Sequence, residues 1–170
     1  MTGLRERVAT LRREYAPRDA RPLSGYLATL AAYAGTVAAL GMAVKASGRP
    51  LPERAAAGDV VLLGVATHKL SRLLAKDAVT SPLRAPFTRY ERPAGLGEVG
   101  EQVRDDGPGP RHAIGELLSC PFCLSVWVGT GLTAGLVLAP RTTRLVATAL
   151  TAVAASDFLQ LAYAAANPSR

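Results

Sequence analysis

The sequence is 170 residues long, 49% hydrophobic and 19% charged, with a formal net charge of +7. The charges are unevenly spread, because residues 24–44 and 117–139 contain none. Charge-free runs of this length, without an amphipathic pattern, argue against a water-soluble bundle, since about 20 apolar residues cross a bilayer. No recognition helix, zinc finger or aromatic-rich basic sheet accompanies the positive charge, so we expect no nucleic-acid partner.

The first segment, residues 1–22, is polar, contains six arginines and ends at Pro22. A basic start followed by an apolar run also fits a signal peptide. However, the apolar part of a signal peptide is only about 7–15 residues long, and residues 24–44 exceed that length. We therefore predict a basic cytoplasmic N-terminal segment over 1–22, followed by an uncleaved first span over 24–44.

Residues 57–79 form a predicted helix with two interpretations. Their charge-free centre covers only residues 60–66, and four basic or imidazole side chains follow it: His68, Lys69, Arg72 and Lys76. The helix crosses the membrane if its long side chains extend to the interface. An amphipathic helix lying on the membrane surface fits the same pattern. Ser81-Pro82 ends the helix in both interpretations.

The remaining elements are a connection and two more spans. Residues 80–116 are rich in glycine, proline and charge, and we predict a long, exposed and mobile cytoplasmic loop. Residues 117–139 and 145–167 are the third and fourth predicted spans. The sequence PRTTR, residues 140–144, is predicted to make the tight turn between them.

The distribution of basic residues decides the number of spans. With four spans and a cytoplasmic N-terminus, thirteen basic residues face the cytoplasm and five face outward. This distribution obeys the positive-inside rule, whereas no orientation of a three-span protein does so. We therefore predict an all-α integral membrane bundle of about four transmembrane helices, with residues 24–167 as its membrane domain, in a bacterial cytoplasmic membrane.

The only two cysteines, Cys120 and Cys123, are spaced to lie together in the first turn of a helix that Pro121 begins. A helix N-terminus favours the thiolate, so a redox pair is one interpretation. A metal site, with zinc as the expected ion, would need His68 and His112 as the remaining ligands. The third interpretation is that the two thiols pack at a helix contact.

Two further sets of polar residues are candidates for function. His68, Arg72 and Lys76 form one stripe on the predicted helix, and Asp77 is positioned to pair with Arg84. This stripe is either an interfacial anchor or a docking surface for lipid head groups or a partner. Asp157 lies inside the last span, where a carboxylate normally faces a partner or water, and His68 or Arg72 is its expected partner.

Two stretches, "HKLSRLLAKDAVTSPLRAPF" (68–87) and "RHAIGELLSCPFCLSVWVG" (111–129), resemble a known family. They are similar to the bacterial membrane proteins of domain-of-unknown-function family thirteen-sixty, which includes a sporulation protein. The resemblance implies a small multi-pass membrane protein and supplies no biochemical activity. The positions that match its motifs are Arg72, Asp77, Arg84, Pro86, Phe87, Gly115, Glu116, Cys120, Cys123 and Trp127.

These observations together predict a non-enzymatic membrane component that binds a partner at its cytoplasmic face or stabilises an assembly. The cysteine pair would be structural or bind metal. The alternative is a thiol-disulfide membrane oxidoreductase that uses the CPFC pair. The residues expected to face lipid or a partner are Arg72, Lys76, Asp77, Arg84, Phe87, Glu116 and Trp127.

Overall fold

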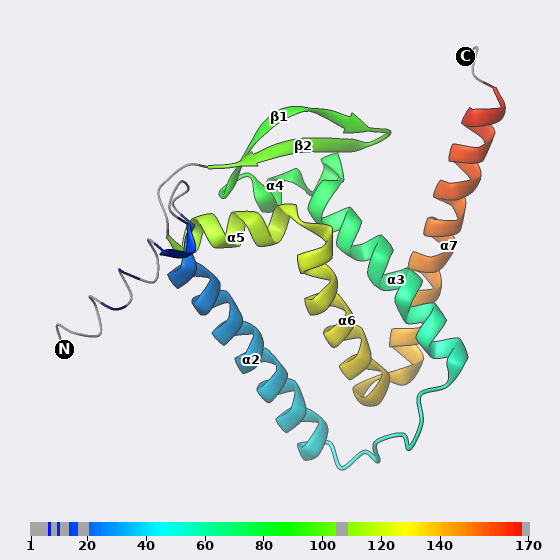
Figure 1. The fold of residues 1–170 in the computed structure, drawn as a ribbon. Coiled ribbons are helices and arrows are strands. Elements are labelled where there is room, and N and C mark those ends of the chain that lie inside the picture. Colours follow the sequence, from blue (N-terminus) through cyan, green and yellow to red (C-terminus); the bar gives the residue numbers. More distant parts are fainter. Residues whose placement is uncertain (1–6, 8–9, 11–13, 17–20, 105–108, 168–170) are drawn as a thin grey trace.

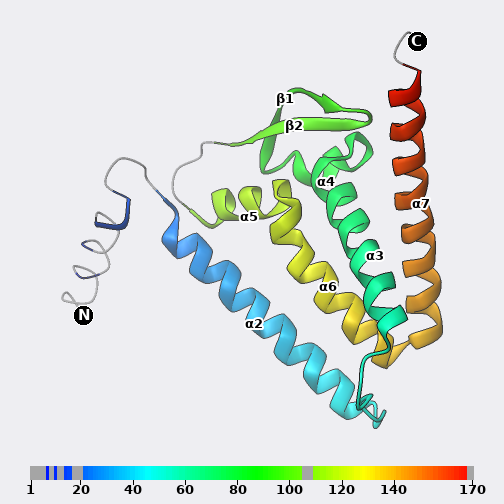
Figure 2. The ribbon, with the colours of Figure 1, turned by 45° about the vertical axis from the view of Figure 1, so that its right-hand side comes forward.

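The computed structural model describes residues 7, 10, 14–16, 21–104 and 109–167. Four long helices dominate these residues: α2 (Leu23–Ala46), α3 (Ala57–Lys76), α6 (Pro121–Leu138) and α7 (Pro140–Ala166). They alternate in direction along the chain, as the two views agree (Figure 1, Figure 2). The prediction for residues 1–22 lies mostly outside the described residues.

The connection between α3 and α6 is structured, so the predicted mobile loop over 80–116 is wrong for most of its length. It contains a 3-10 turn η1 (Ala78–Thr80), a short helix α4 (Ser81–Arg84), two strands β1 (Thr88–Gly95) and β2 (Glu98–Val103), and a helix α5 (Pro110–Ser119). The antiparallel strands also mean that the fold is mainly helical rather than all-α.

The β-hairpin turns at glycine for a physical reason. Gly95 and Gly97 have φ values of 152° and 78°, which side chains with a Cβ rarely adopt. The flanking strand sequences, TRYERPAG and EVGEQV, lack the alternation of apolar and polar residues that marks a half-buried strand. The glycines therefore indicate a turn here, but the flanking sequences do not predict strands.

Proline also shifts the bounds of the last two predicted spans. Leu117–Ser119 belong to α5, because Cys120 is extended before Pro121 and a new helix begins there. At the other end of α6, Pro140 is the first residue of α7, so PRTTR is the first turn of a helix and only Ala139 interrupts the two helices. The second predicted span ends at Lys76 rather than at residue 79.

Three described helices are long and apolar enough to cross a membrane: α2, α6 and α7. A membrane location is therefore plausible on length and composition. α3 is not among the three, and it lies against both α6 and α7 (Figure 2). Its residues Leu63 and Ala66 form the small buried core with Ala147 of α7. The more polar helix is thus the one that the other helices cover.

The two ends of the bundle differ. We call the end covered by α4, the two strands and α5 the hairpin end, and the opposite end the loop end. The loop end contains residues 47–56 and the α6–α7 junction (Figure 1). An ion pair between Asp59 and Arg144, 2.7 Å, joins the starts of α3 and α7 at the loop end. The ion pair links the first turns of these two helices.

Helix α2 approaches α5 most closely at Gly25. A Cβ there would lie 2.7 Å from the Ala113 Cβ and 2.9 Å from the Gly109 carbonyl oxygen, whereas a Cβ at Gly35 would meet nothing within 4 Å. We expect Gly25→Ala to lower the free energy of unfolding by about 1–3 kcal/mol, because the backbones must separate. Gly35→Ala, on the same helix, should be neutral or slightly stabilising. Unfolding titrations of both variants in detergent micelles measure the difference, and equal effects would contradict the close contact.

Candidate functional site

The two cysteines form the N-terminal turn of α6, as predicted from their spacing and from Pro121. Cys120 is the residue before the helix, and its sulfur accepts a hydrogen bond from the Cys123 backbone N–H at 3.3 Å. The Cys123 thiol donates to the Cys120 sulfur at 2.8 Å, and both thiols are free. The pair is therefore preorganised by the helix start.

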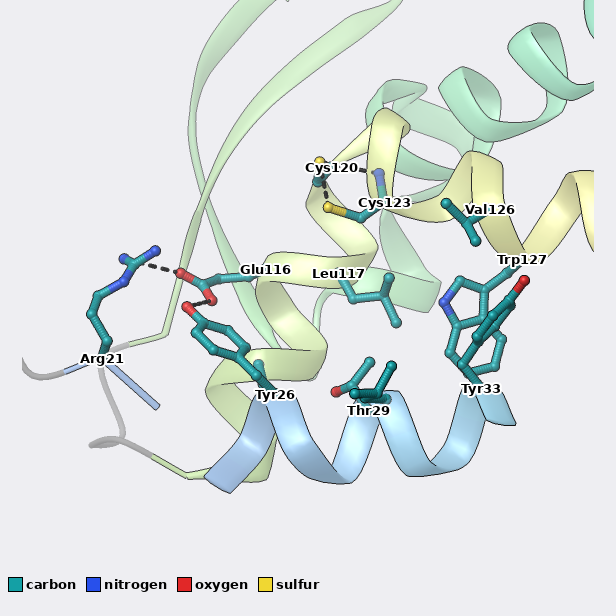
Figure 3. A pocket seen from close by; sticks show the side chains of 12 residues that line it. Arg21, Tyr26, Thr29, Tyr33, Glu116, Leu117, Cys120, Cys123, Val126 and Trp127 are labelled. Atoms are coloured by element: carbon teal, nitrogen blue, oxygen red, sulfur yellow. Dashed lines mark hydrogen bonds and ion pairs between the residues drawn. The ribbon is translucent and has the colours of Figure 1, made fainter. Parts of the chain in front are cut away.

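The cysteines border a cleft of about 550 Å³ between α2 on one side and α5 with α6 on the other (Figure 3). Most of the lining is apolar. The lining residues are Arg21, Tyr26, Thr29, Leu30, Tyr33, Ala113, Glu116, Leu117, Cys120, Cys123, Val126 and Trp127. Glu116, Trp127 and the cysteine pair, which the sequence singled out separately, are thus brought to one place.

One end of this cleft is polar and centres on Glu116. The Tyr26 hydroxyl donates to the Glu116 carboxylate at 2.6 Å, and an Arg21 nitrogen lies 3.4 Å from the second carboxylate oxygen. His112 Nε2 lies 3.6 Å from that same oxygen. The Arg21 guanidinium also lies over the Tyr26 ring, 5.9 Å from its centre. Glu116 therefore has polar neighbours from α2, from α5 and from the segment before α2.

The other end of the cleft is aromatic. The rings of Tyr33 and Trp127 meet edge to face at 5.2 Å, and the Tyr33 hydroxyl and the Thr130 hydroxyl are hydrogen-bonded at 2.8 Å. These contacts hold α2 to the middle of α6 (Figure 3). Two contacts, one polar and one aromatic, therefore hold α2 to α5 and α6 at the two ends of the cleft.

A second cavity, of about 520 Å³, lies between α3, the hairpin turn and the second half of α7. The Lys69 ammonium and the Asp157 carboxylate form an ion pair at 2.6 Å at its side. Asp157 thus faces a cation, but the cation is Lys69 rather than the expected His68 or Arg72. His68 lines the same cavity, and Arg72 makes two hydrogen bonds, 2.6 and 2.8 Å, to Glu98 of β2.

Arg84 is buried, with 1% of its side chain exposed, so the expectation that it faces lipid or a partner is wrong. Its guanidinium pairs with Glu101 of β2 at 2.9 Å and donates to the carbonyl oxygens of Leu74 and Asp77 at the end of α3. Arg84 thus contacts Asp77 as expected, but through the backbone carbonyl of Asp77 and not through its carboxylate. The Asp77 carboxylate instead accepts the Val79 N–H. Arg84 therefore fastens the hairpin to α3.

Glu101 shares this network, and its pKa is lowered. Partial burial raises the pKa of Glu101, but hydrogen bonds from Arg84, Thr88 and Ser81, with the charge of Arg84, outweigh burial and hold the pKa below its ordinary value of 4.5. A carboxyl with a lowered folded-state pKa stabilises the fold above its unfolded pKa. This contribution is lost as the pH falls through the folded pKa.

We therefore expect the melting temperature of the protein to fall below pH 4.5 more steeply than in Glu101→Gln, which has no carboxyl at this position. Thermal unfolding in micelles from pH 7 to pH 3, compared between the two proteins, isolates the Glu101 contribution from that of the other acids. Parallel curves of melting temperature against pH for the two proteins would show that protonation of Glu101 does not change the stability.

The four residues proposed to bind zinc are not brought together as a site. Among the residues that the structure describes, no group of three or more His, Cys, Asp or Glu side chains could hold a metal ion. His68 lines the second cavity, whereas the cysteines line the cleft beside α2. His112 lies next to Glu116 instead.

The other predicted surface residues are partly covered. Lys76, Asp77 and Phe87 are half-buried at the hairpin end. The Phe87 carbonyl accepts the Arg104 N–H at 2.9 Å, which ties the segment after α4 to the end of β2. The close approach of Val103 of β2 to α5 explains why the motif has glycine at position 115. A Cβ at Gly115 would lie only 2.6 Å from Val103 Cγ1.

Sequence reasoning did not identify Tyr26, Lys69 or Glu101 as partners in these contacts. Tyr26 and Glu116 are 90 positions apart, and Lys69 and Asp157 are 88 apart, so no local spacing relates them. For Lys69 a signal existed, since an acid within an apolar segment needs a cation. Only its exact partner required the fold.

These features define a mainly helical protein with three helices that are long and apolar enough to cross a membrane, a hairpin cap and a cleft beside a cysteine pair. The chain belongs to the family described as "Protein of unknown function (DUF1360)", whose family model matches residues 62–163. The family predicted from the two sequence stretches is therefore confirmed. The matched residues include most of α3, the hairpin, α5, α6 and most of α7, and leave α2 outside.

One relative is the sporulation protein YjcA of Bacillus subtilis (strain 168), which is 41% identical over 69 residues. The match covers 40% of this chain and 58% of the relative's length, so less than two thirds of that protein is matched. No solved structure matches this chain.

Proposed function

We propose that this chain is a four-span protein of a bacterial cytoplasmic membrane that presents its hairpin end to a protein partner and is not itself an enzyme. The single observation that carries the proposal is an exposed strand held rigidly in place. Of the eight residues of β1, only Thr88 is buried. A two-stranded hairpin is at best marginally stable in water, so the buried Arg84–Glu101 pair is what fixes it over the bundle.

The proposed crossing of α3 rests on its length and surroundings. Its 20 residues span about 30 Å, the thickness of the hydrocarbon core. Three of its four charged residues, Asp59, Lys69 and Arg72, each pair with an opposite charge, which lowers their cost in lipid, and the fourth, Lys76, is its last residue. Crossing by α3 also accounts for the alternating directions of the four helices.

The proposed orientation places the hairpin end in the cytoplasm. The last residue of α3 and the connection between α3 and α6 contribute six basic residues to this end: Lys76, Arg84, Arg89, Arg92, Arg104 and Arg111. Together with the arginine-rich residues 1–22 they outnumber the five basic residues of the loop end. The positive-inside rule therefore supports this orientation.

Site-specific photocrosslinking in cells tests the partner. A photoreactive phenylalanine replaces Tyr90, 63% exposed on β1, or Leu145, 71% exposed at the loop end, as the control. We expect a discrete higher-mass adduct from position 90 and none from position 145, and the adduct should disappear in Arg84→Gln. Adducts of equal yield from both positions, or none from position 90, would remove the hairpin as the docking surface.

A second candidate, thiol–disulfide exchange, is favoured by the 2.8 Å contact between the two thiols beside an open cleft. A catalytic pair cycles, so acid trapping of growing cells followed by a maleimide mass shift should find both the dithiol and the disulfide. A packing pair should be found as dithiol alone. The Cys120→Ser, Cys123→Ser double variant separates the two roles, because it abolishes exchange but leaves packing partly intact.

A further inference from the structure

The cleft beside the cysteine pair is elongated and mostly apolar. Its α2 wall runs from Tyr26 to Tyr33, about 10 Å along the helix. Its volume of about 550 Å³ lies within the range that is typical of small-molecule sites. The size and the apolar walls of the cleft match a hydrocarbon chain.

The chemistry of the cleft walls is graded along its length. Arg21, Tyr26 and Glu116 form the end nearest the hairpin, and Val126, Tyr33 and Trp127 form the deeper end (Figure 3). In the proposed orientation the polar end lies at the cytoplasmic interface and the aromatic end lies toward the middle of the bilayer. An amphiphile with one polar head and an apolar chain matches this gradient in position and direction.

The polar end offers an accessible guanidinium to an anionic head group. The Glu116 carboxylate is already engaged by the Tyr26 hydroxyl and by one nitrogen of Arg21. Arg21 nevertheless keeps 49% of its side chain exposed. Arg21 is also the last of the six arginines of residues 1–22. Anionic lipids concentrate at basic segments next to a membrane helix, and a guanidinium matches a phosphate in geometry.

We propose that the cleft binds an anionic phospholipid of the surrounding bilayer, with its phosphate at Arg21 and one acyl chain between Leu30 and the aromatic pair Tyr33–Trp127. The proposal rests on the membrane location and orientation proposed above. It does not depend on the protein partner. The lipid fills the space between α2 and α6 and adds to the direct contacts that Tyr33 makes with Trp127 and Thr130.

The position of the single tryptophan gives a direct readout, because Trp127 lines the cleft. Purified protein in phosphatidylcholine vesicles is compared after adding a small fraction of phosphatidylglycerol or of phosphatidylcholine with brominated chains, which quench tryptophan on contact. We expect brominated phosphatidylglycerol to quench Trp127 at about a fivefold lower mole fraction than brominated phosphatidylcholine. Equal quenching by both, at the level of random lipid contact, would overturn the proposal.

Two variants test the head and the chain separately. Arg21→Gln, at an exposed position, should abolish the preference for phosphatidylglycerol without loss of fold. Leu30→Phe narrows the cleft and should weaken quenching by both brominated lipids, whereas Leu27→Phe, an exposed residue of the same helix outside the lining, should not. An unchanged preference in Arg21→Gln would also contradict the proposal. The quenching experiment uses purified protein without a protein partner. A failure of the lipid proposal is therefore distinguishable from a failure of the crosslinking experiment, which tests the protein partner.

Discussion

Replacing Arg84 with methionine is expected to lower the free energy of unfolding by about 3–5 kcal/mol, because it leaves the buried carboxylate of Glu101 without its cation. Glu101 keeps only 6% of its side chain exposed, so water cannot take over that role. The same change frees the carbonyl oxygens of Leu74 and Asp77, to which the guanidinium donates at 2.7 and 3.0 Å. Chemical unfolding of the purified protein in micelles measures the loss.

The double variant Arg84→Met, Glu101→Leu should recover most of that stability, since an apolar pair leaves no buried charge. Arg89→Ala, an exposed arginine on the same hairpin, should change stability by no more than about 0.5 kcal/mol. If Arg84→Met and Arg89→Ala were equally mild, the network would not be what fastens the hairpin.

The second large effect is expected at Asp157. Asp157→Leu leaves the Lys69 ammonium without this partner, about 10 Å from the end of α3. In the proposed four-span arrangement, a charged side chain at that depth costs roughly 2.5–3.5 kcal/mol. Part of this cost is relieved if the lysine stem extends toward the interface. We expect a loss of about 2–3 kcal/mol in the free energy of unfolding, measured in lipid nanodiscs.

The matched control for Asp157→Leu is Gln160→Leu, one turn further along α7, which removes a polar side chain but no charge. It should be nearly neutral. In the double variant Lys69→Leu, Asp157→Leu, most of the lost stability should return, because neither charge remains. The single variant Lys69→Leu completes the comparison. If the double variant lost as much stability as the two single variants together, the two residues would not be coupled.

The sequence predicted the long apolar helices well, because a charge-free run of 20 or more residues has few other structures available. It misplaced their ends wherever proline decided them. Residues 117–139 contain no charge, but Pro121 splits them between α5 and α6, and Pro140 extends α7 by five residues. Proline at the first position of a helix is compatible with both a turn and a helix start, and hydropathy does not distinguish them.

The hairpin could not be predicted from its pattern. β1 faces solvent at all but one position and is held by a buried arginine rather than by an apolar face. An arginine in a polar connection normally indicates a surface, and Arg84 was interpreted that way. Its burial follows from Glu101, 17 residues later, and from two backbone carbonyls seven and ten residues earlier, a set that only the folded chain assembles.

The candidate site divides in the same manner. The geometry of Cys120 and Cys123 followed from local rules, because positions i and i+3 share a helix face and proline begins a helix. The cleft beside them did not, since α2 supplies one wall from about 90 residues earlier in the chain. The shape of the cleft is therefore a property of the helix arrangement.

The central claim, that α3 crosses the membrane, is tested most directly by determining on which side of the membrane each end of α3 lies. In a Cys120→Ser, Cys123→Ser background, Leu51→Cys places one thiol at the loop end and Val79→Cys places one at the hairpin end, at residues that are 67% and 85% exposed. With a membrane-impermeant maleimide, we expect Leu51→Cys to be labelled in intact spheroplasts and Val79→Cys only in inverted vesicles. Labelling of both from the same side would show that α3 does not cross, and would contradict the four-span account.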